Sequence, residues 1–269
     1  MNVIHQNTDD QLLNEWPQDT SLAAFRRAWV LEGEALWRRV YDVHRDHMQI
    51  KNARAALRNL EKIFQCTFRL ANTRGFQGMS LRDLSRETGI SMGGLYAYIG
   101  SKHELASAIE AVLRQTINDF MADLESHRLG PYERLRAIIH GDLYMNDVMH
   151  SWYYFCYLEA KGMTREQREA AMQMELQFDQ TLKTLFHEGI EAGVFHCEDN
   201  IDLLASQTTA LLQQWYLKRW KFQLRGVAIE TYADFVFRTV LRSLGYRGAI
   251  DTGGGVSDET GQAFTHSLV

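Results

Sequence analysis

The chain has 269 residues, a formal net charge of −5 and only two prolines, and 45% of its residues are hydrophobic. That length suffices for one large or two modest domains, and scarce proline permits long helices almost everywhere. The longest apolar run, residues 152–158, is far shorter than the roughly 18 residues of a membrane span, so no membrane partner is expected. The three cysteines match neither a disulfide framework nor a structural metal site.

Charge is unevenly distributed along the chain. Residues 51–105 carry nine Lys or Arg side chains against four Asp or Glu, a net +5, so the remainder sums to −10. A small basic module in an acidic protein is typical of a chain that meets phosphates with one part only. The first 20 residues contain four acidic and no basic side chains, the opposite of a signal peptide, and we expect a cytoplasmic protein.

Residues 1–50 are interpreted as an N-terminal extension with one long amphipathic helix over about residues 21–48. Its apolar positions recur at helical spacing and include Phe25, Trp29 and Trp37. So large an apolar face must be covered. We expect this helix to pack on the protein's own body, within one chain or across a dimer. A helix lying along DNA is the alternative, disfavoured because the first 50 residues sum to −3.

The basic module reads as a helix followed by two short helices and then a long one. Ser80 and Ser91 are side-chain N-caps for the short pair, and Gly89 breaks the chain between them. Ser101 has the capping-box spacing to Glu104 at the start of the long helix. This is helix-turn-helix geometry, whose second short helix can enter a DNA major groove. The expected helices cover residues 52–74, 81–88, 92–98 and 102–126.

The rest of the chain is also expected to be helical, which gives an all-α fold class. No convincing alternating strand pattern is present. The glycine-rich and polar stretch over residues 247–269 is typical of a disordered tail. The expected helices here cover residues 131–146, 148–160, 164–192, 200–223 and 229–244.

The string MSLRDLSRETGISMGGLYAYIGSKHEL at residues 79–105, preceded by Gly75-Phe76, resembles the TetR family of transcriptional repressors nearly position by position. Ile99 stands where that family commonly has an aromatic residue. The resemblance implies a three-helix DNA-binding domain over 51–105 and a helical effector-binding and dimerisation domain over 106–246. It also implies three partners: an operator of double-stranded DNA, a small-molecule effector and a second copy of the chain.

Candidate DNA contacts follow from this arrangement. The first turn of the recognition helix brings side chains or bare backbone to base edges, and Arg82 suits a bidentate guanine or phosphate contact. The resemblance implies that the hydroxyls of Tyr96 and Tyr98 both meet phosphate, with partial packing of Tyr96 as the alternative. Lys102 would meet phosphate at a helix N-terminus. The candidate residues are Lys51, Arg54, Ser80, Arg82, Ser91, Met92, Gly93, Gly94, Tyr96, Tyr98 and Lys102.

Candidate ligand-pocket residues centre on the stretch Trp152-Tyr153-Tyr154-Phe155-Cys156-Tyr157, which is aromatic on every helix face. Such a helix is suited to deep burial or to a pocket wall. Plain core is the alternative for each residue, because aromatic and Met side chains fill cores first. The candidates are Phe120, Leu124, Trp152, Phe155, Cys156, Met174 and Phe178.

Candidate dimer-interface residues lie near the C-terminus. Residues 215–220 and 231–236 resemble the final two helices of many family members, which pack with their symmetry mates into a four-helix interface. An intramolecular helix pair is the alternative. The candidates are Gln213, Gln214, Trp215, Trp220, Tyr232 and Phe235.

No pattern points to catalysis. None of the ten histidines has zinc-site spacing, and no nucleophile motif, P-loop or dinucleotide fingerprint occurs, so we expect no metal, no cofactor and no catalytic residue. The expected function is a homodimeric regulator, in the first instance a repressor, that leaves a pseudo-palindromic operator when an apolar or aromatic molecule binds. The alternatives are an enzyme or carrier for an aromatic ligand, and an interaction scaffold that docks through the first helix.

Overall fold

The computed structural model describes residues 15–50, 52–159 and 164–249, and every regular element within those ranges is helical. The expected all-α fold class is therefore confirmed for the described chain. The expected tail over 247–269 lies outside the described residues from position 250 onward, and so does Lys51. The elements are α2 (Leu22–Ala28), α3 (Gly33–His44), the short 3-10 helix η1 (Arg45–His47), α4 (Ala53–Arg74), α5 (Leu81–Thr88), α6 (Met92–Tyr96), α7 (Lys102–Ser126), α8 (Pro131–Val148), α9 (His150–Leu158), α10 (Arg165–Glu191), α11 (Ile201–Leu217), α12 (Arg219–Leu224) and α13 (Ile229–Ser243).

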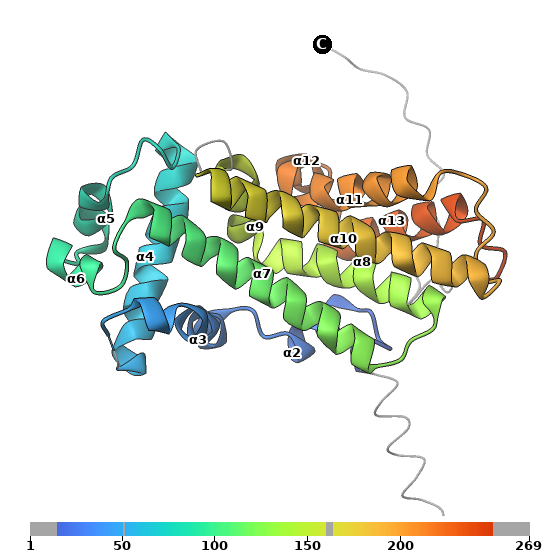
Figure 1. Ribbon diagram of the computed structural model, residues 1–269, viewed down its shortest axis with the longest axis horizontal. Helices are drawn as coiled ribbons and strands as arrows, with labels where there is room; N and C mark the ends of the chain where they lie inside the picture. The colour runs from blue at the N-terminus through green and yellow to red at the C-terminus, as the bar shows by residue number, and fades with distance from the viewer. Residues whose placement is uncertain (1–14, 51, 160–163, 250–269) are drawn as a thin grey trace, which may run out of the picture.

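The helices form an elongated body with the two short helices α5 and α6 at one end (Figure 1). Helices α7 and α10 run along the body, and α8, α11 and α13 pack together in the half remote from α6. Helix α4 contacts α3, α5 and α9, so it joins the short helices to the body.

Helix starts follow the capping signals of the sequence. Asn52 Oδ1 accepts the Ala55 amide at 3.2 Å at the start of α4, and Ser101 Oγ accepts the Glu104 amide at 3.1 Å at the start of α7. The expected capping box at Ser101 is wrong in one bond. The Glu104 carboxylate accepts the amide of Gly100 at 2.8 Å instead of the amide of Ser101.

The single long helix expected over residues 21–48 is wrong, because the structure divides it into α2, α3 and η1. Helix α2 ends at Ala28, and Gly33 restarts the helix with a φ of +57°, a left-handed conformation that favours glycine. The break allows the apolar side chains to cover two separate surfaces. Trp29 meets Phe120 at a centroid distance of 5.6 Å, whereas Trp37 meets α4 and α9.

The helix expected over residues 200–223 is also interrupted, at Lys218 between α11 and α12. The interruption lets Phe222 fold back against two aromatic rings. Its centroid lies 5.0 Å from that of Trp215 and 4.6 Å from that of Tyr232. Neither interruption has a proline to mark it, so both depend on tertiary packing that a periodicity pattern does not contain.

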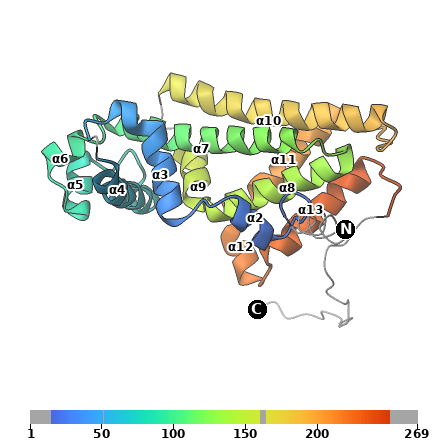
Figure 2. The ribbon, with the colours of Figure 1, turned by 90° about the horizontal axis from the view of Figure 1, so that it is seen from below.

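The described part of the N-terminal extension, residues 15–50, lies along the body and connects its two halves (Figure 2). Helix α2 packs on α8, and the Tyr144 hydroxyl donates to the Thr20 carbonyl at 2.9 Å. Helix α3 packs on α4 and α7, where Arg39 pairs with Asp119 of α7. The extension is thus part of the folded core of this chain.

Gly141 of α8 lies where the rings of Trp16, in the extension, and Phe120 come close to the helix backbone. A Cβ atom at this position would lie 2.2 Å from Phe120 Cζ and 2.9 Å from Trp16 Cζ2, both in buried rings. Gly141→Ala is therefore expected to lower the free energy of unfolding by about 2 kcal/mol through overpacking. Urea unfolding measures this loss. An unchanged midpoint would show that the extension does not pack against α8 in solution.

Candidate nucleic-acid interface and ligand cavity

The first short helix of the helix-turn-helix unit, α5, is fixed at both ends by its own sequence. Ser80 Oγ accepts the Asp83 amide at 3.2 Å, and Asp83 accepts the Ser80 amide at 3.0 Å in return, which makes a complete capping box. Ser80 Oγ also donates to Asp83 Oδ2 at 2.6 Å. This bond, the bond from the Ser80 amide and the bond from Arg86 lower the pKa of Asp83 to about 2. Gly89 ends the helix at φ +70° and ψ +9°, as the sequence predicts.

Side-chain hydrogen bonds fix the conformation of the turn between α5 and α6. Ser85 Oγ donates to the Ile90 carbonyl at 2.6 Å, and the Ile90 amide donates to Thr88 Oγ1 at 3.2 Å. Leu84 of α5 and Leu95 of α6 are fully buried. The angle between the two helices is therefore set within the protein and needs no DNA to form it.

The two glycines at the start of α6 differ in their surroundings. A Cβ at Gly94 would meet Ile90 Cγ2 at 3.0 Å and Ser91 Oγ at 3.2 Å, so this position is nearly filled from inside the protein. At Gly93 a Cβ would meet nothing within 4 Å apart from its chain neighbours and the backbone of its own helix, and the residue is exposed. Packing therefore does not require glycine at position 93, which leaves bare backbone facing outward.

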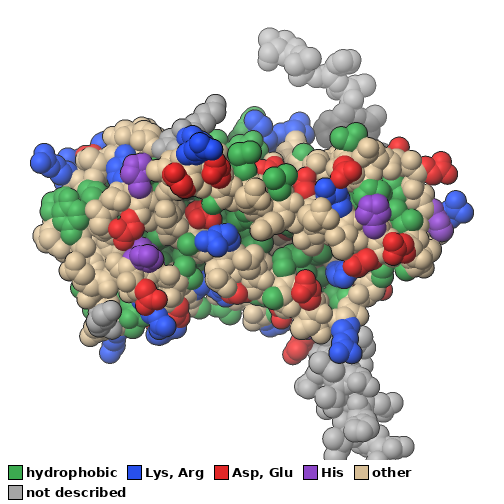
Figure 3. All heavy atoms as spheres, viewed as in Figure 1, with side chains coloured by type: hydrophobic (Ala, Val, Ile, Leu, Met, Phe, Trp, Pro, Cys, Tyr) green, Lys and Arg blue, Asp and Glu red, His purple; other side chains and the backbone are tan. Residues whose placement is uncertain are grey.

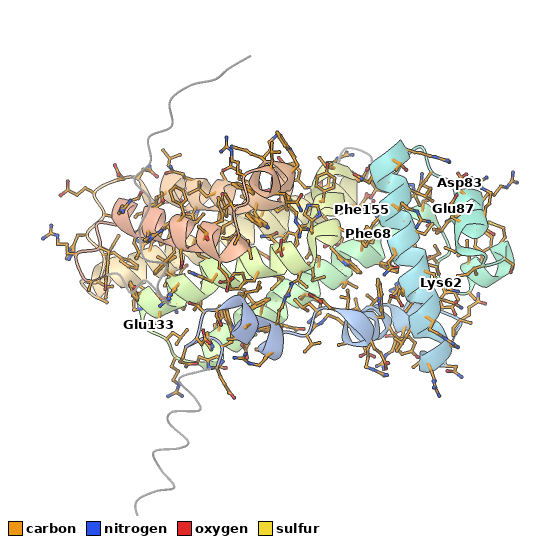
Figure 4. The ribbon with its side chains drawn as sticks, turned by 180° about the vertical axis from the view of Figure 1, so that it is seen from behind. Lys62, Phe68, Asp83, Glu87, Glu133 and Phe155 are labelled. Carbon is orange, nitrogen blue, oxygen red and sulfur yellow. The ribbon has the colours of Figure 1, made fainter. Side chains whose placement is uncertain are left out.

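Acidic side chains on α5 are occupied by neighbouring arginines. Asp83 pairs with Arg86 at 2.6 Å and lies 3.7 Å from Arg74, and Glu87 pairs with Arg69 at 3.4 Å. Asp83 and Glu87 both lie on α5 beside α4 (Figure 4). These pairs reduce the repulsion that two free carboxylates would exert on a phosphate backbone.

The outer surface of this unit carries exposed groups suited to DNA. Arg54 and Arg82 are exposed and have no ion-pair partner in the described part of the chain, and Tyr96 is 49% exposed. Ser80 and Ser91 are exposed caps, and Met92 is half-buried. Apolar side chains lie at the surface over α6, at the left end of the body (Figure 3).

Tyr98 does not lie on this surface with Tyr96, contrary to expectation. It is 4% exposed, and its hydroxyl accepts Asn59 Nδ2 of α4 at 2.8 Å. The ring is buried because the chain turns from α6 into the body at Tyr98 and Ile99, both core residues. The resemblance to a family motif carried no information on this burial, and Asn59 escaped notice because no motif includes it.

Lys102 occupies a different environment from that of a free surface lysine. Its Nζ donates to the Gln77 carbonyl at 3.1 Å and lies 5.0 Å from the centroid of the Phe76 ring. Partial burial lowers the pKa of this ammonium, while the charge of Glu159 opposes the shift. The side chain therefore links α7 to the segment between α4 and α5.

The N-terminal extension also contacts the C-terminal end of α6, the second helix of the helix-turn-helix unit. The sequence analysis did not predict this contact. The Gln49 amide donates to the Ala97 carbonyl at 2.9 Å, and His44 Nε2 lies 3.0 Å from the Tyr98 carbonyl, which accepts its hydrogen. Burial lowers the pKa of His44. The extension thus satisfies two carbonyls that α6 leaves unpaired.

A cavity of about 380 Å³ lies in the body between α7, α8, α9, α10 and α11. Cys156, Met174 and Phe178 line it, and each was among the candidate pocket residues. The cavity lies within the size range of ligand pockets, which are concave and mainly apolar with a few polar groups. A wider cleft of about 690 Å³ lies between α4, α9 and α12.

The other four candidate pocket residues lie elsewhere. Phe120 packs against Phe25 and Trp29 of the extension, and Leu124 is buried and lines a separate cleft with Ile138.

Trp152 packs on Phe64 and Phe68 of α4. Phe155 points toward Phe68 at a centroid distance of 5.9 Å and lines the wider cleft (Figure 4). Trp152 and Phe155 thus attach α9 to α4, whereas Tyr153 and Cys156 of the same stretch line the cavity. Hydrophobic periodicity could not distinguish the residues that pack on α4 from those that line the cavity, because α9 is buried on several sides.

The inner end of the cavity carries a polar group that the sequence analysis missed. Asp142 of α8 lines the cavity and accepts Asn146 Nδ2 at 2.7 Å. Burial raises the pKa of its carboxyl to about 7, against the opposing effect of the Asn146 hydrogen bond. Asp142 and Asn146 stand four residues apart on one helix, the spacing that places side chains together.

This raised pKa gives a stability test with a definite sign. The native protein keeps a proton on Asp142 that the unfolded chain releases near pH 4, so the free energy of unfolding falls as pH rises from about 4 through about 7. The full shift corresponds to about 4 kcal/mol. Because the carboxyl also faces the cavity, where solvent screens its charge, we expect a smaller loss in the free energy of unfolding, about 2 kcal/mol. Urea unfolding at several pH values should show this loss in the wild type relative to Asp142→Asn; parallel curves would contradict it.

The candidate dimer residues divide into an inward and an outward set. Trp215 and Tyr232 are buried: Trp215 Nε1 donates to Asp147 at 3.1 Å, and the Tyr232 hydroxyl donates to the Leu211 carbonyl at 2.7 Å. Both side chains therefore pack within the chain, which matches the alternative of an intramolecular helix pair for these two residues.

The two glutamines also have partners within the chain. Gln213 lines the cavity and donates to Glu175 at 3.1 Å, and Gln214 accepts the Tyr232 hydroxyl at 3.3 Å. By contrast, Trp220 is 63% exposed and Phe235 is 54% exposed. The sequence pattern located the helical segments apart from the break at Lys218, but not which aromatic residues fill the contacts between them.

Two further properties concern the described residues alone. None of their helices is long and apolar enough to cross a bilayer. Their His, Cys, Asp and Glu side chains do not form a group of three or more that could hold a metal ion.

Comparison with known proteins covers both halves of the chain. A family model described as "Bacterial regulatory proteins, tetR family" matches residues 63–109, and one described as "Tetracyclin repressor-like, C-terminal domain" matches residues 128–240. The HTH-type transcriptional regulator PksA of Bacillus subtilis (strain 168) is 28% identical over 79 residues, which cover 29% of this chain and 38% of PksA. The chain spans less than half the length of the curated relatives it matches.

Solved structures share the fold at low sequence identity. A TetR-family regulatory protein from Rhodococcus RHA1 has a TM-score of 0.61 and 17% identity, with 70% of this chain and 97% of that chain covered. AibR in complex with isovaleryl coenzyme A and operator DNA has a TM-score of 0.58 and 19% identity, with 68% and 98% covered. With both family models matched in order along a chain whose described elements are all helical, this protein belongs to the TetR family of bacterial regulatory proteins.

Proposed function

We propose that this protein is a homodimeric transcriptional regulator that represses by occupying a two-fold symmetric operator and leaves it when a small molecule fills the cavity. It acts in the cytoplasm by binding rather than by catalysis. Among the solved relatives, AibR is described in complex with an acyl coenzyme A and operator DNA. The proposal for this chain rests on its own residues.

The observation that carries the proposal is the rigid helix-turn-helix unit with an open, uncharged first turn of α6. Gly93 exposes bare backbone, Tyr96 projects a phenol beside it, and Arg82 lies exposed at the start of α5. Backbone and a phenol can approach a groove closely, and arginine can bond a guanine edge or a phosphate. Two such units, one from each protomer, would meet half-sites about 34 to 36 Å apart or a multiple of that distance.

Coupling between the cavity and the DNA-binding unit is supported by contacts at the start of α7. Leu113 and Ile117 of α7 line the cavity, and the same helix begins at Lys102, directly after the recognition helix. Gln167 Nε2 at the start of α10 donates to the His103 carbonyl at 2.9 Å and lies 2.8 Å from Ser107 Oγ. A ligand that shifts α7 or α10 would therefore move the recognition helix and lower DNA affinity.

Dimerisation is supported by apolar side chains that remain exposed on α11 and α13. Leu203 of α11 is 70% exposed, and Phe235 of α13 is 54% exposed. Exposed apolar residues on adjoining helices are typical of a surface that another protein covers. A two-fold axis through this face would pair α11 and α13 with their copies as a four-helix interface.

The function is tested by a gel-shift assay with the DNA upstream of the protein's own gene. Specific retention of that duplex over an equal excess of unrelated DNA supports the proposal. Binding that does not distinguish the two, or no binding at low salt, would contradict it. The assay also separates this function from an enzyme and from a protein-interaction scaffold, neither of which needs DNA.

The contribution of Lys102 is measurable in the same assay. If its ammonium reaches a phosphate, Lys102→Ala weakens binding to all sequences alike and reduces the slope of log affinity against log salt by about one. Its bond to the Gln77 carbonyl offers a purely structural role instead. An unchanged slope with weaker binding would assign Lys102 to that structural role and remove it from the phosphate contacts.

A further inference from the structure

The inner end of the 380 Å³ cavity combines hydrogen-bonding atoms that have no partner in the described chain. The Asn146 side chain is 1% exposed; its Nδ2 donates to Asp142, but its Oδ1 has no hydrogen bond. The hydroxyl of Tyr153, a residue 9% exposed, also lacks a partner. Buried polar atoms without partners cost about 1–3 kcal/mol each, so such a group calls for a bound molecule.

The rest of the cavity wall is mainly apolar. Met174 and Phe178 of α10 face Leu212 of α11 and Ile117 of α7 across it. Methionine adapts to irregular shapes, and aromatic rings provide flat contact area. The volume of about 380 Å³ admits a body of one or two rings with a short chain.

The charges that line the cavity favour a cation at its inner end. Asp142 is the carboxyl group there. Burial raises the pKa of the Tyr153 and Tyr216 hydroxyls, and the charge of Asp142 adds to both shifts. On α10, Glu175 and Arg168 lie at exposed positions nearer the surface. A ligand carboxylate at the inner end would meet the like charge of Asp142, whereas an ammonium would neutralise it.

We propose that this cavity binds a small molecule with an aromatic or apolar body and a protonated amine. The amine donates its hydrogens to the Asp142 carboxylate, to Asn146 Oδ1 and to the Tyr153 hydroxyl, and the body packs between Met174 and Phe178. Three acceptors match the three donors of a primary ammonium group. The inference rests on the proposed function, for which it names the class of effector.

Asp142 is suited to this role by its surroundings. Burial raises the pKa of its carboxyl to about 7, so the empty cavity holds a partly protonated group and avoids an isolated buried charge. An ammonium beside it favours the ionised form. The titratable and charged groups that line the cavity with it from neighbouring elements are Tyr153, Cys156 and Tyr157 of α9, Arg168 and Glu175 of α10, and Tyr216 of α11.

The test compares three probes that share one body: 4-phenylbutylamine, 4-phenylbutan-1-ol and 4-phenylbutyrate. Calorimetry with the full-length protein near pH 8 measures the affinity of each. The amine is expected to bind at least about tenfold more tightly than the alcohol, and the carboxylate more weakly than both. A carboxylate that binds as tightly as the amine would overturn the proposal, and so would the absence of binding by all three at millimolar concentration.

Two variants test which carboxylate binds the amine. Asp142→Asn should reduce amine affinity about tenfold or more and leave the affinity for the alcohol within about twofold. Glu175→Gln removes a carboxylate nearer the surface and should change amine affinity by less than about threefold. An amine affinity that is unaffected by Asp142→Asn would refute the assigned position even if the amine binds.

These measurements contain no DNA, so they test the proposed ligand class separately from the regulatory function. If operator DNA is bound and some other molecule releases it while the amine does not bind, the ligand class is refuted and the DNA-binding role stands. If the amine binds as described but the protein does not distinguish operator from unrelated DNA, the regulatory role is refuted and the ligand class stands.

Discussion

Phe235→Glu is expected to convert the protein into monomers and to lower its affinity for the operator by about 100-fold or more. Phe235 lies on α13 with 54% of its surface exposed, while Phe237, two residues later, is buried in the core of the same chain. A carboxylate at position 235 fits the folded monomer because it replaces an exposed side chain. In a two-fold interface two such charges would face a desolvated surface or each other, which disfavours association strongly.

The loss of DNA affinity follows from the loss of the second half-site. In a dimer, binding of one DNA-binding unit holds the second unit close to its half-site at a high effective concentration. This commonly raises the overall affinity by a factor of about 100 or more. Light scattering gives the mass, and a gel shift gives the affinity. Leu176→Glu on α10 is the matched control, because Leu176 is 57% exposed and α10 is not one of the two helices placed in the interface. A Phe235→Glu protein that stays dimeric would remove α13 from the interface.

Gly93→Glu is expected to abolish operator binding while leaving the fold intact. A Cβ at this position would meet nothing within 4 Å beyond its chain neighbours and its own helix backbone, so packing offers no steric conflict. A carboxylate in the first turn of α6 is also favourable next to the helix dipole, by about 0.5 kcal/mol. On DNA the same carboxylate would enter a groove lined by phosphates, and the repulsion should lower affinity by at least about 100-fold.

A control for Gly93→Glu must change the net charge equally at a remote site. Gln177→Glu on α10 does so at an exposed position. Its operator affinity should remain within about twofold of wild type, and thermal unfolding should show both variants folded. If Gly93→Glu and Gln177→Glu bind the operator equally well, the first turn of α6 does not approach DNA.

Local sequence signals were sufficient for much of the fold. Ser80, Gly89 and Ser91 define α5, the turn and α6 because capping and left-handed glycine are short-range effects. The position of α7 was also predictable from Ser101 and helical periodicity. The two broken helices were not predictable, since the breaks serve contacts between residues far apart in sequence, such as Trp29 with Phe120.

The site was predictable in part for the same reason. The exposed positions of Arg82, Gly93 and Tyr96 follow from helix faces, whereas the burial of Tyr98 depends on how α6 turns into the body. Asp142 gave no signal in the sequence because a single carboxylate on a helix is usually a surface residue. Only the packing of α7, α9, α10 and α11 around it makes that carboxylate part of a cavity.

Selection from a pool of random DNA duplexes tests the central claim, sequence-specific recognition of DNA by this chain, most directly. The protein is predicted to enrich one two-fold symmetric sequence whose half-site centres lie about 10 base pairs apart or a multiple of that spacing. The wild type should enrich it, and Gly93→Glu should not. Recovery of a random pool by the wild type, at a salt concentration where non-specific binding is suppressed, would contradict the account.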